Sequence, residues 1–418
     1  MGTELVVVGL GYVGLPVVVE ASRSGLRCVG FDVSASVVAK LAGGRSHVDD
    51  IDDRVVAEVL AGGTSFSDDA DCLDGAEVVV VCVPTPLKDD RTPDLSAVES
   101  ASRTIAARLR RGTLVVLEST TYPGTTDGLV REILETSGLR AGTDFHLAFS
   151  PERIDPGNPN YSLKNTPKVV GGLTPACTER AAAFYGRFVD EVVPVSGPRE
   201  AEMAKLLENT YRHVNIALVN EMAVFSHDLG IDLWEAIRAA ETKPFGFAAF
   251  RPGPGVGGHC IPIDPNYLSH QVRSLGYQFR FVELAQEISG RMPAYVVARV
   301  QDALNDVGKP VRGSRVLVLG LTYKPDIADA RESPATGVIQ HLRRLSADVV
   351  AHDPHLDSFV VDGEAVSLVA DLPASLATCD LALLLQTHSQ YDLDEVARLA
   401  PLVFDTRGRM RHPNVYRL

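Results

Sequence analysis

Short runs of apolar residues alternate with segments of helical periodicity over the first 150 residues of the chain. The apolar runs are bounded by Gly, Pro or charge and predict buried strands at Leu5–Gly9, Cys28–Asp32, Glu77–Val83, Leu114–Leu117 and Phe145–Phe149. Amphipathic segments between them predict helices, among them Leu15–Ser24, Ser34–Leu41 and Ser96–Leu109. Strands that alternate with helices are typical of βαβ units and a parallel sheet.

The periodicity changes from about Gly197 onward. Glu200–Leu229 keeps apolar residues at helical spacing and contains no Gly or Pro, so it predicts one long helix. A second helix is predicted at Leu233–Ala240. A third is predicted over Val282–Asn305, with Pro293 marking a break or a fresh start.

The opening pattern returns after Lys309-Pro310. Three strand-like runs recur in the same order: Arg315–Leu321 matches Glu4–Leu10, Val349–Asp353 matches Cys28–Asp32, and Asp380–Leu385 matches Glu77–Cys82. Chance similarity between generic α/β strands is the alternative, and three matches in one order make it less favoured. We therefore predict an α/β fold with two Rossmann-like, doubly wound parallel-sheet domains, 1–196 and 309–418, joined by a long central helical segment, 197–308.

Composition and charge exclude several classes of protein. Hydrophobic residues make up 45% and charged residues 22% of 418 residues, as in globular proteins. A net charge of −14 disfavours nonspecific nucleic-acid binding. The chain has no apolar run of membrane-spanning length and no basic start typical of a signal peptide. Six cysteines without CxxC pairs favour reduced thiols, so we expect a cytoplasmic protein with no nucleic-acid or membrane partner.

A dinucleotide-binding pattern follows the first predicted strand. Gly9-Leu10-Gly11-Tyr12-Val13-Gly14 is G-x-G-x-x-G at the start of a helix, and Asp32 ends the next strand. The glycines allow backbone N–H groups to approach a pyrophosphate, and Asp32 can accept hydrogen bonds from a ribose. No Arg follows Asp32, which favours NAD over NADP. A glycine-rich turn without a ligand is the alternative. The predicted cofactor contacts are Gly9, Gly11, Tyr12, Val13, Gly14 and Asp32.

Two further strand ends fall on the same expected edge of the sheet. Pro84 and Thr85 follow one strand, and Ser119 and Thr120 follow the next. Cofactors lie at this edge in doubly wound sheets, so all four residues are candidates for contacts near the nicotinamide. Ordinary loop chemistry is the alternative.

The segment Pro252–Asp264 is the most unusual in the chain. Cys260 follows a glycine-rich loop, beside His259 and four residues before Asp264. A partly exposed thiol near cations can act as a nucleophile. From the pattern alone, a catalytic Cys260 and a structural cysteine in a tight loop are equally favoured. The other five cysteines sit in apolar or helical patterns that predict inert thiols. A zinc site from these residues is disfavoured because paired ligands at metal spacing are missing, so we predict no metal.

Several motifs together resemble one known family. They are Gly257-Gly258-His259-Cys260-Ile261-Pro262-Ile263-Asp264-Pro265, Ser150-Pro151-Glu152-Arg153 with Asp155-Pro156-Gly157-Asn158, Lys205 with Asn209, and Tyr323-Lys324-Pro325 with Arg331-Glu332-Ser333-Pro334. Their types and order resemble the UDP-glucose/GDP-mannose dehydrogenase family, the nucleotide-sugar 6-dehydrogenases, over nearly the whole chain. Pro252–Pro265 is more similar to the branch that acts on UDP-N-acetylhexosamines, and Lys243–Phe247 points towards UDP-N-acetylglucosamine.

The resemblance implies a four-electron oxidation at C6 of a UDP-hexose to a carboxylate, with two NAD⁺ used in succession. Cys260 would form a thiohemiacetal and then a thioester, as a thiol attacks carbonyls and leaves readily. Lys205 and Asn209, four residues apart on a helix, would stabilise the oxyanion. Asp264 would move protons through water or Lys205, while Glu152 and Thr120 would position the hydrolytic water.

The resemblance also assigns substrate contacts. Lys324 would meet a diphosphate or sugar, and Arg331 would reach the cofactor or the phosphates. The remaining substrate candidates, besides Glu152, Lys205 and Asn209, are Arg153, Arg251 and Gly257. Lys324 and Arg331 could instead be surface cations that pair with a nearby acid, and Lys205 and Asn209 could be a surface Lys and a solvated Asn.

The second α/β half departs from the cofactor pattern, because Gly320-Leu321-Thr322-Tyr323 lacks G-x-G-x-x-G. We expect this half to bind UDP and no second dinucleotide. Ser289 stands where the family would have Asn, and Arg251 can alter substrate or subunit contacts. The long helix is expected to form a homodimer.

Three alternative functions remain open from the sequence. One is a UDP-glucose 6-dehydrogenase. Another is a two-electron dehydrogenase of the 3-hydroxyacid type, which would use Lys205 and Asn209 without Cys260. The third is an NAD-sensing or nucleotide-binding regulator, which is disfavoured because no DNA-reading helix is visible. The product could feed a surface polysaccharide or a glycosylated antibiotic.

Overall fold

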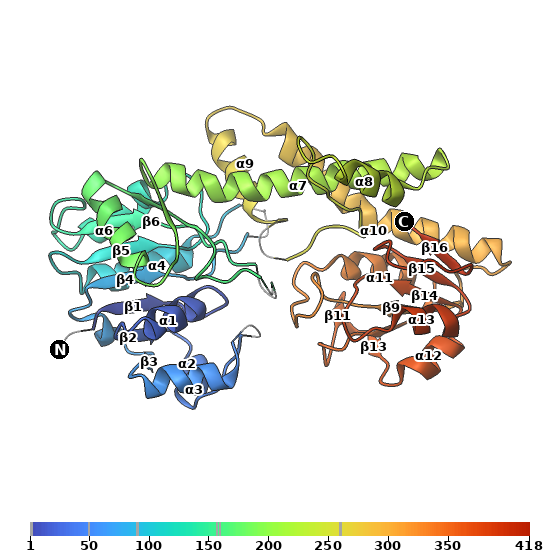
Figure 1. Cartoon of the computed structure of the whole chain (residues 1–418), viewed down its shortest axis with the longest axis horizontal. Helices are drawn as coiled ribbons and strands as arrows, with labels where there is room; N and C mark the ends of the chain where they lie inside the picture. Colours follow the sequence, from blue (N-terminus) through green and yellow to red (C-terminus); the bar gives the residue numbers. More distant parts are fainter. Residues whose placement is uncertain (1–2, 49–50, 89–91, 156–157, 159, 259–260) are drawn as a thin grey trace. The chain divides into compact units, whose positions relative to one another are not determined.

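The computed structural model describes residues 3–48, 51–88, 92–155, 158, 160–258 and 261–418 (Figure 1). The chain forms two compact units. Unit 1 consists of Met1–Glu208 with Asn266–Gln278, and unit 2 of Asn209–Pro265 with Phe279–Leu418. In the part of the chain that the structure describes, no helix is long and apolar enough to cross a membrane.

Unit 1 is built on an eight-stranded sheet in the order β3-β2-β1-β4-β5-β6-β7-β8. Its strands are β1 (Leu5–Val8), β2 (Cys28–Phe31), β3 (Ser65–Ser67), β4 (Val78–Val81), β5 (Leu114–Leu117), β6 (His146–Phe149), β7 (Lys168–Gly172) and β8 (Val192–Val195). Neighbouring strands pair in parallel, except that β7 runs antiparallel to β6. The five strands predicted from apolar runs are therefore confirmed as the centre of one sheet.

Helices cover both faces of this sheet, which explains why its central strands are apolar on both sides. They are α1 (Gly14–Arg23), α2 (Ala35–Ala42), α3 (Asp53–Ala61), α4 (Ser96–Ala106), α5 (Arg131–Glu135) and α6 (Pro175–Tyr185). Leu15 and Val18 of α1 pack with Val7 and Val80 on one face. On the other face, Val98 of α4 packs in the core that contains Val6 and Val79. The two cores hold the carboxyl ends of β1, β2, β4, β5 and β6 at one edge.

Unit 2 contains a second, six-stranded parallel sheet in the order β13-β10-β9-β14-β15-β16. Its strands are β9 (Arg315–Leu319), β10 (Asp348–His352), β13 (Ser367–Leu368), β14 (Leu381–Leu384), β15 (Val403–Asp405) and β16 (Val415–Arg417). Helices α11 (Pro334–Arg344), α12 (Leu372–Thr378) and α13 (Leu393–Leu399) flank it, and β11 (Val360–Val361) pairs with β12 (Glu364–Ala365). The matched runs of the sequence are thus equivalent central strands, and the predicted fold class is confirmed.

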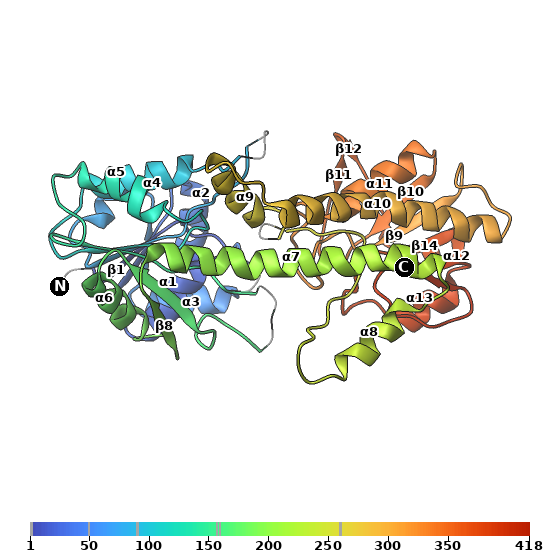
Figure 2. The same cartoon turned by 90° about the horizontal axis from the view of Figure 1, so that it is seen from above.

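Four helices lie between the two sheets in the sequence. These are α7 (Pro198–Asp228), α8 (Leu233–Glu241), α9 (Asp264–Ser274) and α10 (Arg280–Asp306), and Figure 2 shows α7 as one long, unbroken helix. The long helix over Glu200–Leu229 and the helix over Leu233–Ala240 are confirmed. Helix α7 contributes residues to both units.

The predicted break at Pro293 is wrong, because α10 continues through this residue for 27 residues in all. Proline removes one N–H donor from a helix and crowds the preceding turn. Here the proline ring packs closely on α11, where a Cβ added to Gly337 would lie 3.1 Å from it. Burial of Met292, Val296 and Val300 in the same core supplies the packing that keeps the helix continuous.

Candidate active site

The glycine-rich turn after β1 meets three different demands. Gly9 has a φ of +91°, and a Cβ there would lie 2.7 Å from the carbonyl oxygen of Cys82. A Cβ on Gly14 would lie 1.8 Å from the carbonyl oxygen of Gly9, so α1 starts against the turn itself. A Cβ on Gly11, by contrast, would meet no atom within 4 Å. This open space, at a helix start without a side-chain cap, fits a pyrophosphate.

Asp32 connects the end of β2 to the glycine-rich turn. Its carboxylate accepts hydrogen bonds from the backbone N–H groups of Leu10 and Ser34, each at 2.9 Å. A carboxylate has about four acceptor positions, so these bonds leave capacity for ribose hydroxyls. Tyr12 and Val13 are half-buried against the core below. The residues of the predicted cofactor turn therefore come together in a shape that fits NAD.

The turns after β4 and β5 lie at the same edge of the sheet, because Val81 pairs with both Val8 and Leu117. The Ser119 hydroxyl donates to the carbonyl oxygen of Val83 at 2.8 Å and so joins the two turns. The four candidates from these turns differ in exposure: Ser119 is buried, Thr85 and Thr120 are half-buried, and Pro84 is exposed. Their contacts with the nicotinamide stay predictions.

Glu152 follows β6 and meets Lys205 of α7. The Lys205 ammonium group donates to the carbonyl oxygen of Glu152, and both side chains are buried. One carboxylate oxygen of Glu152 accepts the Ile154 N–H, whereas Oε2 is buried with no hydrogen-bond partner among the described residues. Burial raises the pKa of Glu152, against the opposing charges of Lys168 and Lys205. A carboxyl group in this state is suited to proton transfer.

Arg153 is held by neighbours within unit 1. Its guanidinium donates to the carbonyl oxygen of Pro167 at 2.6 Å and forms an ion pair with Glu208 at 2.8 Å. The predicted contact with substrate would therefore compete with these partners, and it stays a prediction.

Asn209 and Asp264 come together in unit 2. The Asn209 amide donates to Asp264 Oδ2 at 2.5 Å, and both residues are more than nine-tenths buried. Asp264 is also the first residue of α9, where a carboxylate interacts favourably with the helix dipole. Cys260 and His259, the centre of the predicted reactive segment, lie outside the described residues. The hydrogen bond of Asp264 thus holds the chain a few residues beyond Cys260.

The glycines before Cys260 serve close packing within unit 2. A Cβ on Gly257 would lie 2.7 Å from the carbonyl oxygen of Glu332, and one on Gly258 would lie 2.6 Å from the Tyr323 ring. The Gly258 N–H donates to the carbonyl oxygen of Arg331 at 3.1 Å. The glycine-rich loop is therefore fixed on the segment after β9. The predicted substrate contact of Gly257 is not tested by this packing.

The three cations predicted to bind ligands in unit 2 have different surroundings. Arg331 is paired with Asp329 through two hydrogen bonds, at 2.8 and 2.5 Å. Arg251 forms an exposed ion pair with Glu241 at 2.7 Å. Lys324 is half-buried, and its carbonyl oxygen accepts the Thr322 hydroxyl. Their ligand contacts stay predictions.

The second sheet repeats the contacts of Asp32 but fills the space beside them. Asp353, at the end of β10, accepts the N–H groups of Leu321 at 2.6 Å and His355 at 2.9 Å. A buried imidazole, His388, lies 3.1 Å from the same carboxylate, where the first sheet has no such side chain at Asp32 among the described residues. The protein's own histidine thus takes the acceptor position that a ribose would use, which gives a physical reason for expecting no second dinucleotide.

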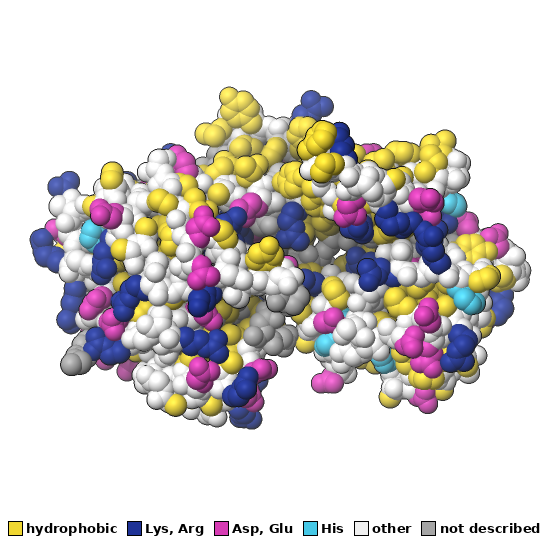
Figure 3. All heavy atoms as spheres, viewed as in Figure 1, with side chains coloured by type: hydrophobic (Ala, Val, Ile, Leu, Met, Phe, Trp, Pro, Cys, Tyr) yellow, Lys and Arg dark blue, Asp and Glu magenta, His cyan; other side chains and the backbone are white. Residues whose placement is uncertain are grey.

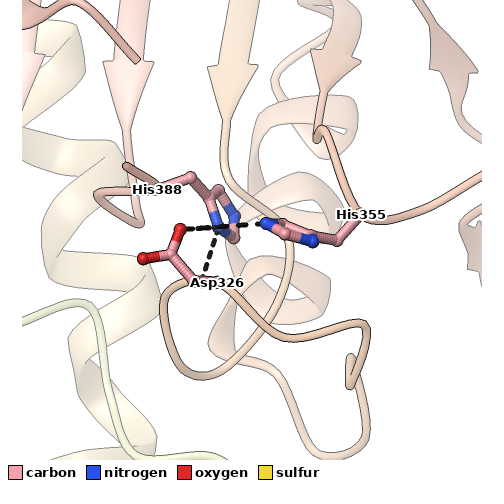
Figure 4. A group of neighbouring side chains, drawn as sticks. All are labelled: Asp326, His355 and His388. Atoms are coloured by element: carbon pink, nitrogen blue, oxygen red, sulfur yellow. Dashed lines mark hydrogen bonds and ion pairs between the residues drawn. The ribbon is translucent and has the colours of Figure 1, made fainter. Parts of the chain in front are cut away.

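Asp326, His355 and His388 form the one cluster of metal-ligand types found among the described residues (Figure 4). His388 Nδ1 accepts the backbone N–H of Asp326 at 3.0 Å, and its Nε2 faces Asp353. A metal needs a free nitrogen lone pair, and the Nδ1 lone pair is already engaged. We therefore assign this cluster a structural role, in which His388 joins the Asp326 backbone to Asp353 at the end of β10.

A buried network behind the first site was missed from the sequence. Lys168 of β7 forms an ion pair with Glu118 at 2.8 Å, and the Tyr185 hydroxyl of α6 donates to the same carboxylate. All three side chains are at most 2% exposed. The available signal was a lysine that opens a valine-rich strand and a glutamate directly after an apolar one.

The described cysteines are confirmed as free thiols. Burial raises the pKa of Cys28 to about 12 and that of Cys72 and Cys379 to about 11, so these thiols stay protonated. They are unsuited to nucleophilic chemistry, as predicted.

Family models match three successive parts of the chain. The NAD binding domain of the UDP-glucose/GDP-mannose dehydrogenase family matches residues 3–189, its central domain 199–290 and its UDP binding domain 317–412. A UDP-N-acetyl-D-mannosamine dehydrogenase from Pyrococcus horikoshii is 37% identical over 88% of this chain and 90% of its own length. A UDP-N-acetyl-D-glucosamine 6-dehydrogenase from Pseudomonas aeruginosa is also 37% identical, over 84% of this chain and 82% of its own.

Solved structures agree with these matches. The structure of the Pyrococcus horikoshii enzyme has a TM-score of 0.89 at 33% identity and covers 99% of this chain and 98% of its own. A UDP-glucose dehydrogenase from Pyrobaculum islandicum has a TM-score of 0.86 at 28% identity and covers 99% and 96%. The chain belongs to the UDP-glucose/GDP-mannose dehydrogenase family and has its NAD binding, central and UDP binding domains.

Proposed function

We propose that the protein oxidises the C6 hydroxymethyl group of a UDP-N-acetylhexosamine to a carboxylate in two successive two-electron steps. The observation that carries the proposal is the buried hydrogen bond between Asn209 and Asp264. It joins α7, which also carries Lys205 one turn earlier, to the chain just beyond Cys260. A charged donor, an amide and a carboxylate are the groups that a thiol-dependent oxidation of an aldehyde needs.

In the proposed reaction, two NAD⁺ molecules would bind one after the other, and each would accept one hydride and leave as NADH. The first oxidation converts the alcohol to an aldehyde, and the hydroxyl proton passes to solvent. The Cys260 sulfur then adds to the aldehyde carbon to give a thiohemiacetal, and loss of a second hydride gives a thioester. Water attacks the thioester, the carbon–sulfur bond breaks, and the carboxylate and the free thiol are formed.

The other candidate catalytic residues have proposed roles in these reaction steps. Lys205 and Asn209 stabilise the oxyanion that develops when sulfur or water adds to the carbonyl group. Asp264 receives a proton through water or Lys205. Glu152, with Thr120, positions the water that hydrolyses the thioester and accepts its proton.

The sugar is proposed at the level of the N-acetylhexosamine class. The relatives named above act on UDP-N-acetyl-D-mannosamine in one case and UDP-N-acetyl-D-glucosamine in the other, at the same identity. The segment Lys243–Phe247 favours UDP-N-acetylglucosamine through its resemblance to that branch. UDP-glucose is the alternative substrate.

The proposal is tested by the number of NADH molecules formed per sugar consumed. NAD⁺ is supplied with UDP-N-acetylglucosamine, UDP-N-acetylmannosamine, UDP-N-acetylgalactosamine and UDP-glucose in separate reactions. Two NADH per sugar with an N-acetylhexosamine is expected. One NADH, or no reaction with any of the four, would contradict the proposed function, and a clear preference for UDP-glucose would replace the proposed sugar.

A substitution of the proposed nucleophile tests the covalent step. Cys260→Ser is expected to lose turnover to the carboxylate by a factor of about 100 or more, because a serine alkoxide forms less readily than a thiolate. Cys379→Ser, at one of the buried thiols, is the control. Carboxylate formation at the normal rate by Cys260→Ser, followed by mass spectrometry of the sugar, would remove Cys260 from the mechanism.

We further propose that the protein is a homodimer formed through α7 and that it acts in the cytoplasm. Tyr211, Leu218 and Phe225 recur every seven residues on α7, and each side chain is about half exposed. A seven-residue spacing places them on one face of the helix. Figure 3 shows hydrophobic side chains gathered over this part of α7. Free thiols are typical of a reducing compartment.

The domain limits are also proposed as predicted from the sequence. An NAD-binding domain covers residues 1–196, a central segment with the Cys260 loop covers 197–308, and a UDP-binding domain covers 309–418.

A further inference from the structure

Lys168 is a buried cation that the proposed chemistry does not use. It is the first residue of β7, and its ammonium group lies 2.8 Å from Glu118 Oε2 and 5.2 Å from the centre of the Tyr185 ring. Taking a lysine and a glutamate out of water costs free energy that their attraction does not always return. Stability alone is therefore a weak reason for an ion pair at this place.

The reversed direction of β7 explains how Lys168 reaches the site. Phe149 at the end of β6 pairs with Gly171, so the start of β7 extends beyond the carboxyl end of β6. At this point the Lys168 ammonium group donates to the carbonyl oxygen of Pro151 at 3.4 Å. Strands β5 and β6 run in the opposite direction to β7, so they start at the other edge of the sheet. An antiparallel strand is thus what brings this lysine to the reactive edge.

Lys168 joins the two turns that carry the proposed hydrolytic residues. Glu118 directly follows β5 and is two residues before Thr120. Pro151 lies just after β6 and directly before Glu152. The pairing of Leu117 with Phe149 holds the strand ends side by side, and Lys168 bonds to the turn after each. Tyr185 fixes the second oxygen of Glu118 from α6.

The same groups determine the electrostatic environment of Glu152. Burial raises the pKa of Glu152, the positive charges of Lys168 and Lys205 lower it, and the negative charge of Glu118 raises it. The Ile154 N–H adds a hydrogen bond that favours the anion. These are the charged and donor groups of unit 1 that act on Glu152 from β7, α7, the turn after β5 and its own turn.

We propose that Lys168 is a positioning residue for thioester hydrolysis, which fixes Glu152 relative to Thr120 and supplies positive charge that keeps Glu152 able to accept a proton from water. This inference rests on the proposed function, because it concerns the hydrolytic step of that reaction. It predicts that the network acts on the second half of the reaction more than on the first hydride transfer.

The test compares Lys168→Met with Lys168→Arg, which keeps the charge. Turnover to the carboxylate is measured between about pH 5.5 and 9, and the first NADH is followed separately by rapid mixing. In Lys168→Met the kcat near neutral pH is expected to fall about tenfold, and its acid limb to move up by about one pH unit, because Glu152 loses a stabilising cation. The burst of the first NADH is expected to change by less than about threefold. Lys168→Arg is expected to retain the wild-type pH profile.

Glu118→Gln is expected to shift the pH dependence of kcat in the direction opposite to Lys168→Met. It removes a negative charge that raises the pKa of Glu152, so the acid limb of kcat is expected to move to lower pH. Thermal unfolding and NAD⁺ affinity of each variant show whether unit 1 is folded. If Lys168→Met does not fold, the direction of the shift in Glu118→Gln decides the proposal.

An unshifted acid limb in a folded Lys168→Met, with kcat reduced equally at every pH, would overturn the inference and leave a structural role. Failure of the proposed function gives a different result, since the wild-type protein would then form one NADH per sugar or none. Two NADH per sugar from the wild type together with an unshifted limb overturns the inference alone.

Discussion

Single carboxylates decide much of the chemistry of this chain, and equivalent ones in its two sheets have different roles. Asp32 and Asp353 both accept two backbone N–H groups after the second strand of their sheet. Asp32 is half-buried, whereas Asp353 is buried beneath His388. Among the described residues, the difference between the predicted nucleotide contact of Asp32 and the internal hydrogen bond of Asp353 is therefore one histidine side chain.

Asp32→Ala is expected to weaken NAD⁺ binding by about 1–3 kcal/mol, because hydrogen bonds between a carboxylate and ribose hydroxyls are lost. The affinity is measured by calorimetric titration with NAD⁺. Asp353→Asn is the matched control at the equivalent position of the second sheet, and its NAD⁺ affinity is expected to remain that of the wild type. Equal affinities of Asp32→Ala and wild type would mean that this residue does not bind the cofactor.

The raised pKa of Glu202 predicts part of the pH dependence of the unfolding free energy. It is a buried residue of α7 that accepts the N–H groups of Gly124 at 2.7 Å and Thr126 at 2.9 Å. Burial raises its pKa to about 7 although these donors favour the anion. The pKa of this carboxyl group is higher in the folded protein than its unfolded value near 4.5. The group therefore stabilises the fold fully below about pH 4.5, and this stabilisation is lost as the pH rises through about 7.

The loss is expected to reach at most about 3 kcal/mol of unfolding free energy from this group. It is measured as the change in Tm between about pH 5 and 8. In Glu202→Gln this part of the pH dependence is expected to disappear, whereas Glu200→Gln, on the first turn of the same helix, should retain it. Identical curves for Glu202→Gln and wild type would contradict the assignment.

At the scale of elements, the turn from β1 to α1 separates folding from binding within one motif. Gly14 has no room for a side chain, and Gly11 faces open space. Gly14→Ala is expected to lower the unfolding free energy by about 2–4 kcal/mol, because α1 must move away from the turn. Gly11→Ala is expected to keep its Tm and to bind NAD⁺ at least about tenfold more weakly, since its methyl group enters the proposed pyrophosphate space.

Both variants are measured by thermal unfolding and NAD⁺ titration. The assignment of the open space would be contradicted if Gly11→Ala bound NAD⁺ normally. The close contact at Gly14 would be contradicted if Gly14→Ala unfolded at the wild-type temperature.

Elements were predictable where the local pattern was complete. The apolar run Val78–Val81 and the uninterrupted helical period of residues 200–228 are confirmed as a strand and a helix. The effect of Pro293 was not predictable, because the packing of its ring on Gly337 involves a residue far away in the sequence. The reversed strand β7 was also missed, because Lys168–Gly172 looks like any buried strand and only its partner β6 defines its direction.

At the scale of the whole molecule, the exposed face of α7 predicts the state of assembly. Leu218→Glu would place a carboxylate in the proposed interface and is expected to weaken the dimer by at least about 2 kcal/mol, or roughly 30-fold. Sedimentation at several protein concentrations measures this. Leu345→Glu, at the end of α11 and also exposed, is the matched control and is expected to sediment as the wild type. A monomeric wild-type protein would contradict the proposed dimer.

The sequence by itself determined the two α/β halves, the NAD-binding turn and the membership of a dehydrogenase family, because each depends on local periodicity or on contiguous motifs. The tertiary structure alone decided that Lys205 contacts the turn of Glu152, that Asn209 bonds to Asp264, and that Lys168 lies beside Glu118. It also decided that the His388 ring lies 3.1 Å from Asp353 in the second sheet. These contacts join residues 35 to 55 positions apart in the sequence. The packing that selects them therefore cannot be predicted from any local segment.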